Sequence, residues 1–377
     1  MSRDSRLRAF VERDPLNPIL LCDLLDELLA EGRVDDALAQ LRASPSEMRT
    51  LPAVRFREAR CALVHHDFLA VAALLQPLMD QVAGVPAGIA HDLAYAQFAL
   101  GHLDDALQVL AATQPQGEDA VAVAVLKARI YYQQLRYDDA LDVLQPITDG
   151  PRLAEALGLR AILLLDKGEM AEASSAAGQA LGINPMQYEA MIVRGTVALE
   201  EQQLELSQAV FEQVLTVDPH SGRALLGMGE NQMLRAAVPE ARALIERASE
   251  EMPQHIGTWH ALAWCQLLEG DLQGAARSFE RAFAIDRTFG ETHGGMALVS
   301  ALRGERRAAE ESIKRAMRLA PHGLSARYAQ SVLLLDAGQP EAAQEIVDSI
   351  LQQPTRHTMG IPADFVFKLR ELVRPRG

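Results

Sequence analysis

Apolar residues recur at helical spacing along most of the chain, in two short stripes that repeat about every 34 residues. Within each period, positions 4, 7, 8 and 11 form one stripe, and positions 20, 24 and 27 form another. Spacings of three and four residues place side chains on one helical face, so each period predicts two amphipathic helices. The ten periods begin near residues 18, 52, 87, 121, 154, 188, 222, 256, 290 and 324.

Small residues occupy fixed points of the period. Position 8 is Ala, Gly or Ser in nine of the ten periods, and position 20 is mostly alanine, which lets two helices cross at close range. Position 15 is glycine in six periods, and glycine tolerates the positive φ that ends a helix. These six are Gly32, Gly101, Gly168, Gly270, Gly304 and Gly338.

This pattern resembles the tetratricopeptide repeat family, most closely in the period from Ile256 to Phe289. Its Trp259, Leu262, Ala263, Ala275, Phe279 and Ala282 stand where that family has its signature residues. The resemblance covers roughly residues 18–357. It implies an all-α, right-handed superhelical solenoid of about ten helix-turn-helix repeats. We expect capping helices in residues 1–17 and 358–377, because the ends of a solenoid expose apolar faces. Helix breakers favour a bend or a subdomain boundary near 113–120.

Composition narrows the classes of partner. A net charge of −15 disfavours nucleic acid, because an acidic chain repels phosphate backbones. No apolar stretch is long enough for a membrane span, and the N-terminus lacks the apolar core of a secretory signal. Cys22, Cys61 and Cys265 are far apart, which indicates a reducing cytoplasm and neither a disulfide framework nor a zinc site. The scarcity of lysine relative to arginine suggests a bacterial origin.

No catalytic or cofactor-binding motif stands out in the sequence. Gly227 and Gly229 lack the third glycine of a dinucleotide-binding loop. His255 and His260 are five residues apart, which does not place both on one helical face as a metal site would need. We therefore expect no enzymatic activity, no cofactor and no bound metal.

The family resemblance places positions 2, 5, 9, 12 and 13 of each period on a concave surface. Aromatic and arginine side chains at these positions in the N-terminal half are typical of binding hot spots. Packing of Phe98 against the next repeat is an equally good interpretation of that residue. From the fifth period onward these positions become acidic, which is also what a solvated surface would show. The N-terminal candidates are Phe56, Arg60, His91, Tyr95, Phe98, Arg129 and Tyr132.

The two tryptophans differ in their expected roles. Trp259 takes position 4 and is expected in the core, whereas Trp264 takes position 9, beside His260 on the concave surface. Gly294 and Gly295 in the next period would leave a hollow with Trp264 as one wall and a partner side chain as occupant. The alternative is that Trp264 packs onto Leu267, Leu268 and Leu298 and fills that space.

These features favour a non-catalytic scaffold or adaptor that binds a peptide or helix of a partner protein in its concave groove. A more specific hypothesis, from family analogy, is a chaperone or accessory factor of bacterial secretion or envelope assembly. A sensor whose groove binds a small peptide or metabolite is the alternative. The sequence names no partner and leaves the oligomeric state open.

Overall fold

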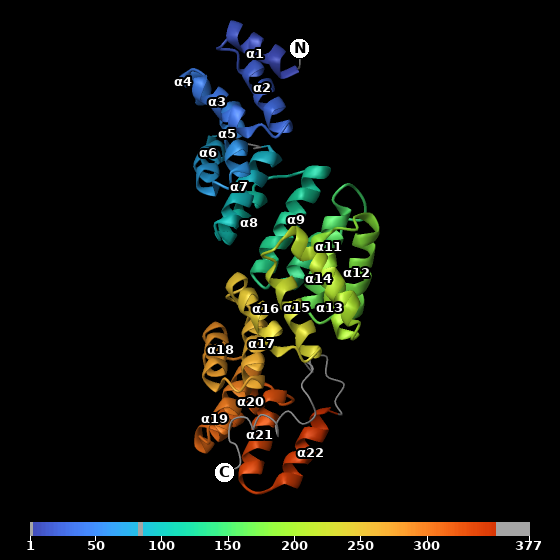
Figure 1. Cartoon of the computed structure of the whole chain (residues 1–377). Coiled ribbons are helices and arrows are strands. Elements are labelled where there is room, and N and C mark those ends of the chain that lie inside the picture. Colours follow the sequence, from blue (N-terminus) through green and yellow to red (C-terminus); the bar gives the residue numbers. More distant parts are fainter. Residues whose placement is uncertain (1–2, 82–85, 352–377) are drawn as a thin grey trace. The chain divides into compact units, whose positions relative to one another are not determined.

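Helices alone make up the regular structure of the described residues, 3–81 and 86–351, in the computed structural model (Figure 1). These residues form ten pairs of a first and a second helix. The first helices are α2 (Pro18–Ala30), α5 (Pro52–Val64), α7 (Ala87–Ala99), α9 (Glu118–Gln133), α11 (Leu153–Asp166), α13 (Tyr188–Glu200), α15 (Gly222–Leu234), α17 (Ile256–Leu268), α19 (Gly290–Leu302) and α21 (Leu324–Asp336). The second helices are α3 (Val34–Ala43), α6 (Phe68–Gln81), α8 (Leu103–Ala111), α10 (Tyr137–Leu144), α12 (Met170–Ile183), α14 (Leu204–Val217), α16 (Val238–Glu251), α18 (Leu272–Ile285), α20 (Arg306–Leu319) and α22 (Pro340–Leu351).

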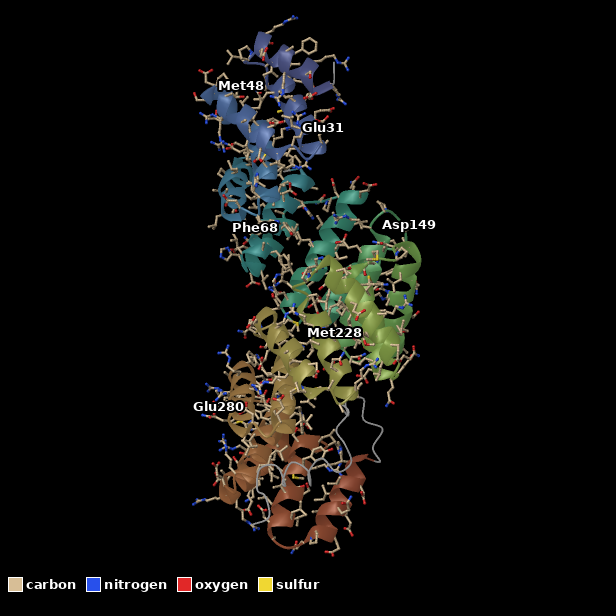
Figure 2. The ribbon with its side chains drawn as sticks, in the orientation of Figure 1. Glu31, Met48, Phe68, Asp149, Met228 and Glu280 are labelled. Carbon is tan, nitrogen blue, oxygen red and sulfur yellow. The ribbon has the colours of Figure 1, made fainter. Side chains whose placement is uncertain are left out.

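The expected all-α repeat architecture is confirmed, and eight of the ten first helices begin at the residue where a period begins. Helix α9 begins three residues before its expected start, and α11 begins one residue before. One short helix, α4 (Ser46–Arg49), was not expected; it lies between the first two pairs and buries Met48 (Figure 2).

The turn inside each pair requires a left-handed residue at position 15. All six glycines there have positive φ, between 72° and 81°. The other four pairs place His66, Leu135, Gln202 and Ala236 at the same position, with φ between 56° and 61°. The turn geometry therefore persists where the sequence does not supply glycine.

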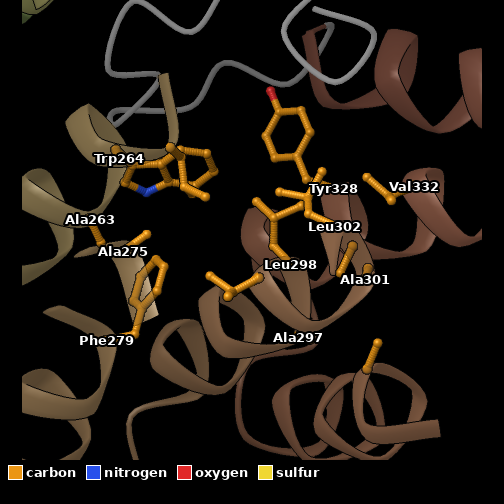
Figure 3. Close-up of a cluster of buried hydrophobic side chains, with 14 of the residues drawn as sticks. Ala263, Trp264, Ala275, Phe279, Ala297, Leu298, Ala301, Leu302, Tyr328 and Val332 are labelled. Atoms are coloured by element: carbon orange, nitrogen blue, oxygen red, sulfur yellow. The ribbon is translucent and has the colours of Figure 1, made fainter. Parts of the chain in front are cut away.

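Small residues let the two helices of a pair approach closely. In the eighth repeat Ala263 of α17 and Ala275 of α18 are fully buried near Phe279 (Figure 3). The Phe279 ring also packs against Gly295 of the next repeat. A methyl group at Gly295 would overlap that ring, so the missing side chain is a packing requirement.

The chain divides into two compact units, Met1–Pro185 and Met186–Gly377. Unit 1 begins with α1 (Arg3–Arg13), which packs Leu7 and Val11 onto the apolar cluster of the first repeat. The residues near 113–120, where the sequence favours a bend, join α8 to α9 within unit 1. The expected cap in 358–377 lies outside the described residues.

Candidate functional site

The first helices of unit 1 carry the concave-surface residues that the sequence singled out. Arg60 on α5 is exposed, and Tyr95 on α7 is 40% exposed. Phe56, His91 and Phe98 are half-buried. His91 and Tyr95 are four residues apart, so they lie on the same side of α7, one turn from each other. Helices α5 and α7 thus present a cation, an imidazole and an open tyrosine ring.

The Tyr95 ring is held by other aromatic rings. Phe68, which begins α6 (Figure 2), meets Tyr95 edge to face with 6.0 Å between ring centroids. The Phe98 ring is tilted against that of Tyr95, with 6.5 Å between the ring centroids. An exposed aromatic side chain fixed in this way loses little conformational entropy on binding, which is the property of a hot spot.

A cavity of about 410 Å³ adjoins His91 at the N-terminal ends of α7, α9 and α11. It holds both signs of charge, because Glu118 and Asp119 of α9 line it together with Arg152, which directly precedes α11. The His91 ring lies 3.4 Å from the Asp92 carboxylate. This volume suits a side chain or a small polar ligand. The remaining lining residues are Ala87, Gly88, Val121, Ala122 and Pro151.

Arg129 and Tyr132 of α9 are engaged by the next repeat. A guanidinium nitrogen of Arg129 lies 3.3 Å from a Glu155 oxygen, and the Tyr132 hydroxyl donates to Asp166 at 2.6 Å. Both side chains are half-buried. A search for acidic residues within the same repeat misses these partners, because they are supplied by α11. Arg129 and Tyr132 thus join repeats, whereas Arg60 and Tyr95 are more exposed.

In unit 2 the structure corrects the expectation for His260. This residue is 7% exposed, and its Nε2 lies 2.8 Å from the Thr292 hydroxyl. Phe279 and Phe289 meet the imidazole edge to face at 5.4 and 5.5 Å. Burial lowers the pKa of His260 from 6.5 to about 4, so the ring is neutral at physiological pH. It is a core histidine and not part of an open surface.

The expected hollow beside Trp264 is filled. Trp264 is 4% exposed and meets the Tyr328 ring edge to face at 5.9 Å (Figure 3). A methyl group at Gly294 would lie 2.7 Å from the backbone nitrogen of Ala326, so this glycine allows α19 and α21 to touch. Gly295 accommodates Phe279. The prediction of an open wall at Trp264 and Gly294 is therefore wrong, because neighbouring helices use the space that the glycines release.

Trp259 is the more exposed of the two tryptophans, contrary to its expected place in the core. It is half-buried, its indole N–H donates to the Pro253 carbonyl at 2.9 Å, and the Arg281 guanidinium lies 5.2 Å from the ring centroid. The ring packs against the edge of the core cluster, and Arg281 over it belongs to the paired helix α18.

Carboxylates mark the concave surface at the start of unit 2. Glu200 of α13 is exposed, and Glu230 of α15 is half-buried. Loss of hydration and the charge of Glu200 raise the pKa of Glu230 to about 7. Glu230 is therefore only partly ionised at neutral pH, because burial and the neighbouring Glu200 both disfavour its charged form.

Within residues 3–81 and 86–351, no cluster of His, Cys, Asp or Glu side chains is arranged to hold a metal ion. The three cysteines are buried free thiols, and burial raises the pKa of each, most strongly that of Cys265, to about 12. No helix in the described part of the chain has both the length and the apolar character needed to cross a membrane.

Sequence reasoning missed Tyr328, the partner of Trp264. Tyr328 stands at position 5 of the last repeat, the position that His91 occupies in the third repeat. Aligning the repeats would therefore have placed Tyr328 on the same side of its helix as the other candidates. The acidic partners Glu155 and Asp166 stand at positions 2 and 13 of the fifth period, where the sequence indicates only surface charge, since pairing across repeats requires knowing which helices are adjacent.

Comparisons with known proteins identify the repeats. One tetratricopeptide repeat model matches residues 91–149, within unit 1, and a second matches residues 198–265, within unit 2. No curated protein matches the sequence.

Among solved structures, the APC/C hetero-tetramer Cut9–Hcn1 is 14% identical over 93% of this chain and 79% of that one, with a TM-score of 0.47. PilW, a type IV pilus biogenesis factor, is 20% identical over 58% of this chain and all of its own, with a TM-score of 0.44. Pseudomonas aeruginosa pilF is 17% identical over 53% of this chain and 90% of its own, with a TM-score of 0.43. The family models match inside both units and the helices repeat in the expected register, so both units of this all-α chain contain tetratricopeptide repeats.

Proposed function

We propose that the protein is a non-catalytic interaction scaffold whose unit 1 binds an extended peptide or an amphipathic helix of a partner protein. The observation that carries this proposal is the open Tyr95 ring, braced by Phe68 and Phe98 and one helical turn from the His91 cavity. Exposed Arg60 adds a charged group on the neighbouring first helix. Rigid aromatic and arginine anchors beside a pocket are the usual composition of a binding hot spot.

Within this class we propose a chaperone or accessory role in bacterial secretion or envelope assembly, exercised from the cytoplasmic side. A surface that binds one partner segment suits delivery or assembly of that partner. Three buried free thiols agree with a reducing compartment.

The cavity beside His91 favours a second candidate function. Its volume of about 410 Å³ lies in the range of small-ligand pockets, and it combines Glu118 and Asp119 with Arg152. A sensor that binds a short peptide or a zwitterionic metabolite there would need no other part of the surface.

Peptides selected from a displayed random library against the full chain separate these functions. Under the scaffold proposal, Tyr95→Ala weakens binding of a selected peptide by tenfold or more, about 1.4 kcal/mol or above. Leu69→Ala, on the second helix α6, removes another exposed apolar side chain and is the control that keeps full affinity. Peptides that bind both variants equally well would show that the binding site does not include Tyr95. A metabolite that copurifies with the chain and is lost on Arg152→Ala would instead support the sensor.

A further inference from the structure

A cavity of about 560 Å³ lies between α20, α21 and α22, the last three helices of the described part of unit 2 (Figure 1). It shares no lining residue with the cavity beside His91 in unit 1. Its volume is in the range of small-ligand pockets. We call it the unit 2 cavity; its apolar lining consists of Ile313, Met317, Leu333, Leu334, Ala337 and Ile346.

The unit 2 cavity coincides with a missing bridge between repeats. Position 14 of a repeat follows the first helix, and in six repeats its side chain reaches the second helix of the preceding repeat. Arg303 of the ninth repeat, for example, donates to the Leu272 carbonyl at 3.2 Å. Position 14 of the last repeat is Ala337, whose methyl group is too short to span the gap to α20. The six bridging residues are His65, Gln134, Lys167, Arg235, Glu269 and Arg303.

One wall of the unit 2 cavity carries a positive charge that no carboxylate neutralises. Lys314 lines the cavity from α20 and is exposed, and within the described residues it has no ion-pair partner. Arg306, on the same wall, lies 2.9 Å from Glu310, so these two charges offset each other. Helix α20 holds five Lys and Arg against two Glu, in a chain whose net charge is −15. The cavity therefore combines apolar walls with a local excess of positive charge.

We propose that the unit 2 cavity binds a small amphipathic anion, with the chemistry of a medium-chain carboxylate. Its apolar body packs against Ile313, Leu333 and Ile346, because burying apolar surface from water is favourable. Its carboxylate pairs with Lys314 at the solvent-exposed side of the cavity. The bound molecule thereby takes the place of the bridge that is missing at Ala337 and links the last repeat to the one before it.

Calorimetric titration of the full chain with decanoate, kept below its micelle-forming concentration, tests this proposal. We expect saturable binding at one site, and weaker binding of decyltrimethylammonium, a cation of the same chain length. Lys314→Gln should weaken decanoate binding by about two- to fivefold, the range of an exposed ion pair. Arg315→Gln is the matched control, since it removes the same charge from an exposed neighbour outside the cavity lining, and it should keep full affinity.

A second variant closes the cavity and leaves Lys314 in place. Ala337→Arg introduces the residue that Arg303 supplies at the same position of the ninth repeat. Since Ala337 is exposed, the longer side chain requires no rearrangement of the core. We expect decanoate binding to weaken by about tenfold or more, with no loss of thermal stability. Ala308→Arg adds the same side chain at an exposed position of α20 outside the cavity lining, and it should bind decanoate as the unaltered chain does.

Three outcomes would overturn the proposal. Equal decanoate affinity of Ala337→Arg and Ala308→Arg would place the binding outside the unit 2 cavity. Equal affinity of the unaltered chain for decanoate and decyltrimethylammonium would show that Lys314 does not select an anion. The third is that decanoate does not bind the unaltered chain, whereas an acidic peptide selected against it binds and is lost on Ala337→Arg, which would identify a protein segment as the occupant.

Discussion

At the scale of single residues, the turn inside each repeat requires a left-handed backbone conformation at position 15. In four repeats a residue other than glycine adopts it, at a cost in free energy. Leu135 has φ of +61° and is 72% exposed, so no burial offsets its left-handed conformation. That conformation costs a residue with a Cβ about 1 kcal/mol or more, whereas glycine adopts it freely. Glycine also makes the unfolded chain more flexible, which reduces the gain.

We therefore expect Leu135→Gly to raise the free energy of unfolding by about 0.5–1 kcal/mol in urea denaturation. Leu135→Ala is the matched control, because it removes the same side chain and keeps the left-handed strain. Equal stabilities of the two variants would show that strain at this residue is negligible.

The two tryptophans should respond to truncation in the order opposite to that expected from their repeat positions. Trp264→Ala opens a cavity in a core that includes Tyr328, and we expect a loss of about 3–5 kcal/mol. Trp259→Ala removes a half-buried ring with one hydrogen bond, and we expect a loss of about 1–2 kcal/mol. Thermal unfolding of both variants checks the order, and a lower melting temperature for Trp259→Ala would contradict the assignment of burial.

His260 should make the protein less stable in acid. Its folded pKa of about 4 lies below the ordinary 6.5, so the unfolded chain binds the extra proton first as pH falls. Stability is unaffected above pH 6.5 and falls progressively toward pH 4, by about 3 kcal/mol for this group. Urea denaturation at a series of pH values should show a shallower slope in this window for His260→Gln.

His220 provides a control of opposite sign for that experiment. The Glu251 carboxylate beside it raises the pKa of His220, so its contribution to stability is present at low pH and lost as pH rises through the folded pKa. His220→Gln should therefore leave the acid slope as steep as in the unaltered chain or steeper. A slope that is the same with and without His260 would mean that other groups dominate.

At the scale of the helices, glycine has two different roles within one fold. Gly294 allows α19 to touch α21, where the nearest obstacle to a methyl group is backbone and cannot move aside. Gly178 in the middle of α12 is exposed and has nothing within 4 Å of the position a methyl group would take.

The same substitution should have opposite effects at these two sites. We expect Gly294→Ala to lower the free energy of unfolding by about 1–3 kcal/mol through overpacking. Gly178→Ala should raise it by about 1 kcal/mol, because alanine favours the helix. Urea denaturation of both variants measures the effects, and a gain in stability from Gly294→Ala would show that α19 and α21 can separate without cost.

The starts of eight of the ten first helices could be predicted from the sequence because one period fixes all ten repeats. The apolar stripes and the small residues set the register, and a shift of a few residues, as at α9, leaves it intact. Helix α4 was not predicted because four residues are too few to show a periodic pattern. The sequence also did not predict that first helices of different repeats come into contact. Trp264 and Tyr328 meet although a whole repeat separates them in the chain.

At the scale of the whole molecule, the two units present surfaces of different character on the same set of repeat positions. In unit 1 these positions carry exposed or half-buried Arg60, His91 and Tyr95. In unit 2 they carry exposed Glu200 and half-buried Glu230 in α13 and α15, but buried Trp264 and Val332 in α17 and α21. The sequence indicates which positions face the concave side, but the exposure of each side chain depends on how closely successive first helices approach. The open part of the candidate site was thus predictable, and the buried part was not.

Substitutions of two arginines in unit 1 should distinguish an effect on partner binding from an effect on folding. Arg60 is exposed, whereas Arg129 forms an ion pair with Glu155 of the next repeat. We expect Arg60→Glu to weaken a peptide selected against the full chain by about 1–2 kcal/mol, because its charge is reversed at the proposed hot spot, while the melting temperature stays unchanged. Arg129→Glu should lower the melting temperature, because it sets two carboxylates against each other between α9 and α11.

Arg42→Glu is the control for both variants, since Arg42 is an exposed arginine on the second helix α3 and reverses the same charge away from the concave positions. Calorimetric titration with the selected peptide and thermal unfolding would be measured on all three chains. Equal affinity losses for Arg60→Glu and Arg42→Glu would show that the peptide responds only to the net charge of the chain. A loss confined to Arg60→Glu would place the peptide on α5, because only a local contact distinguishes two exposed arginines in the same unit.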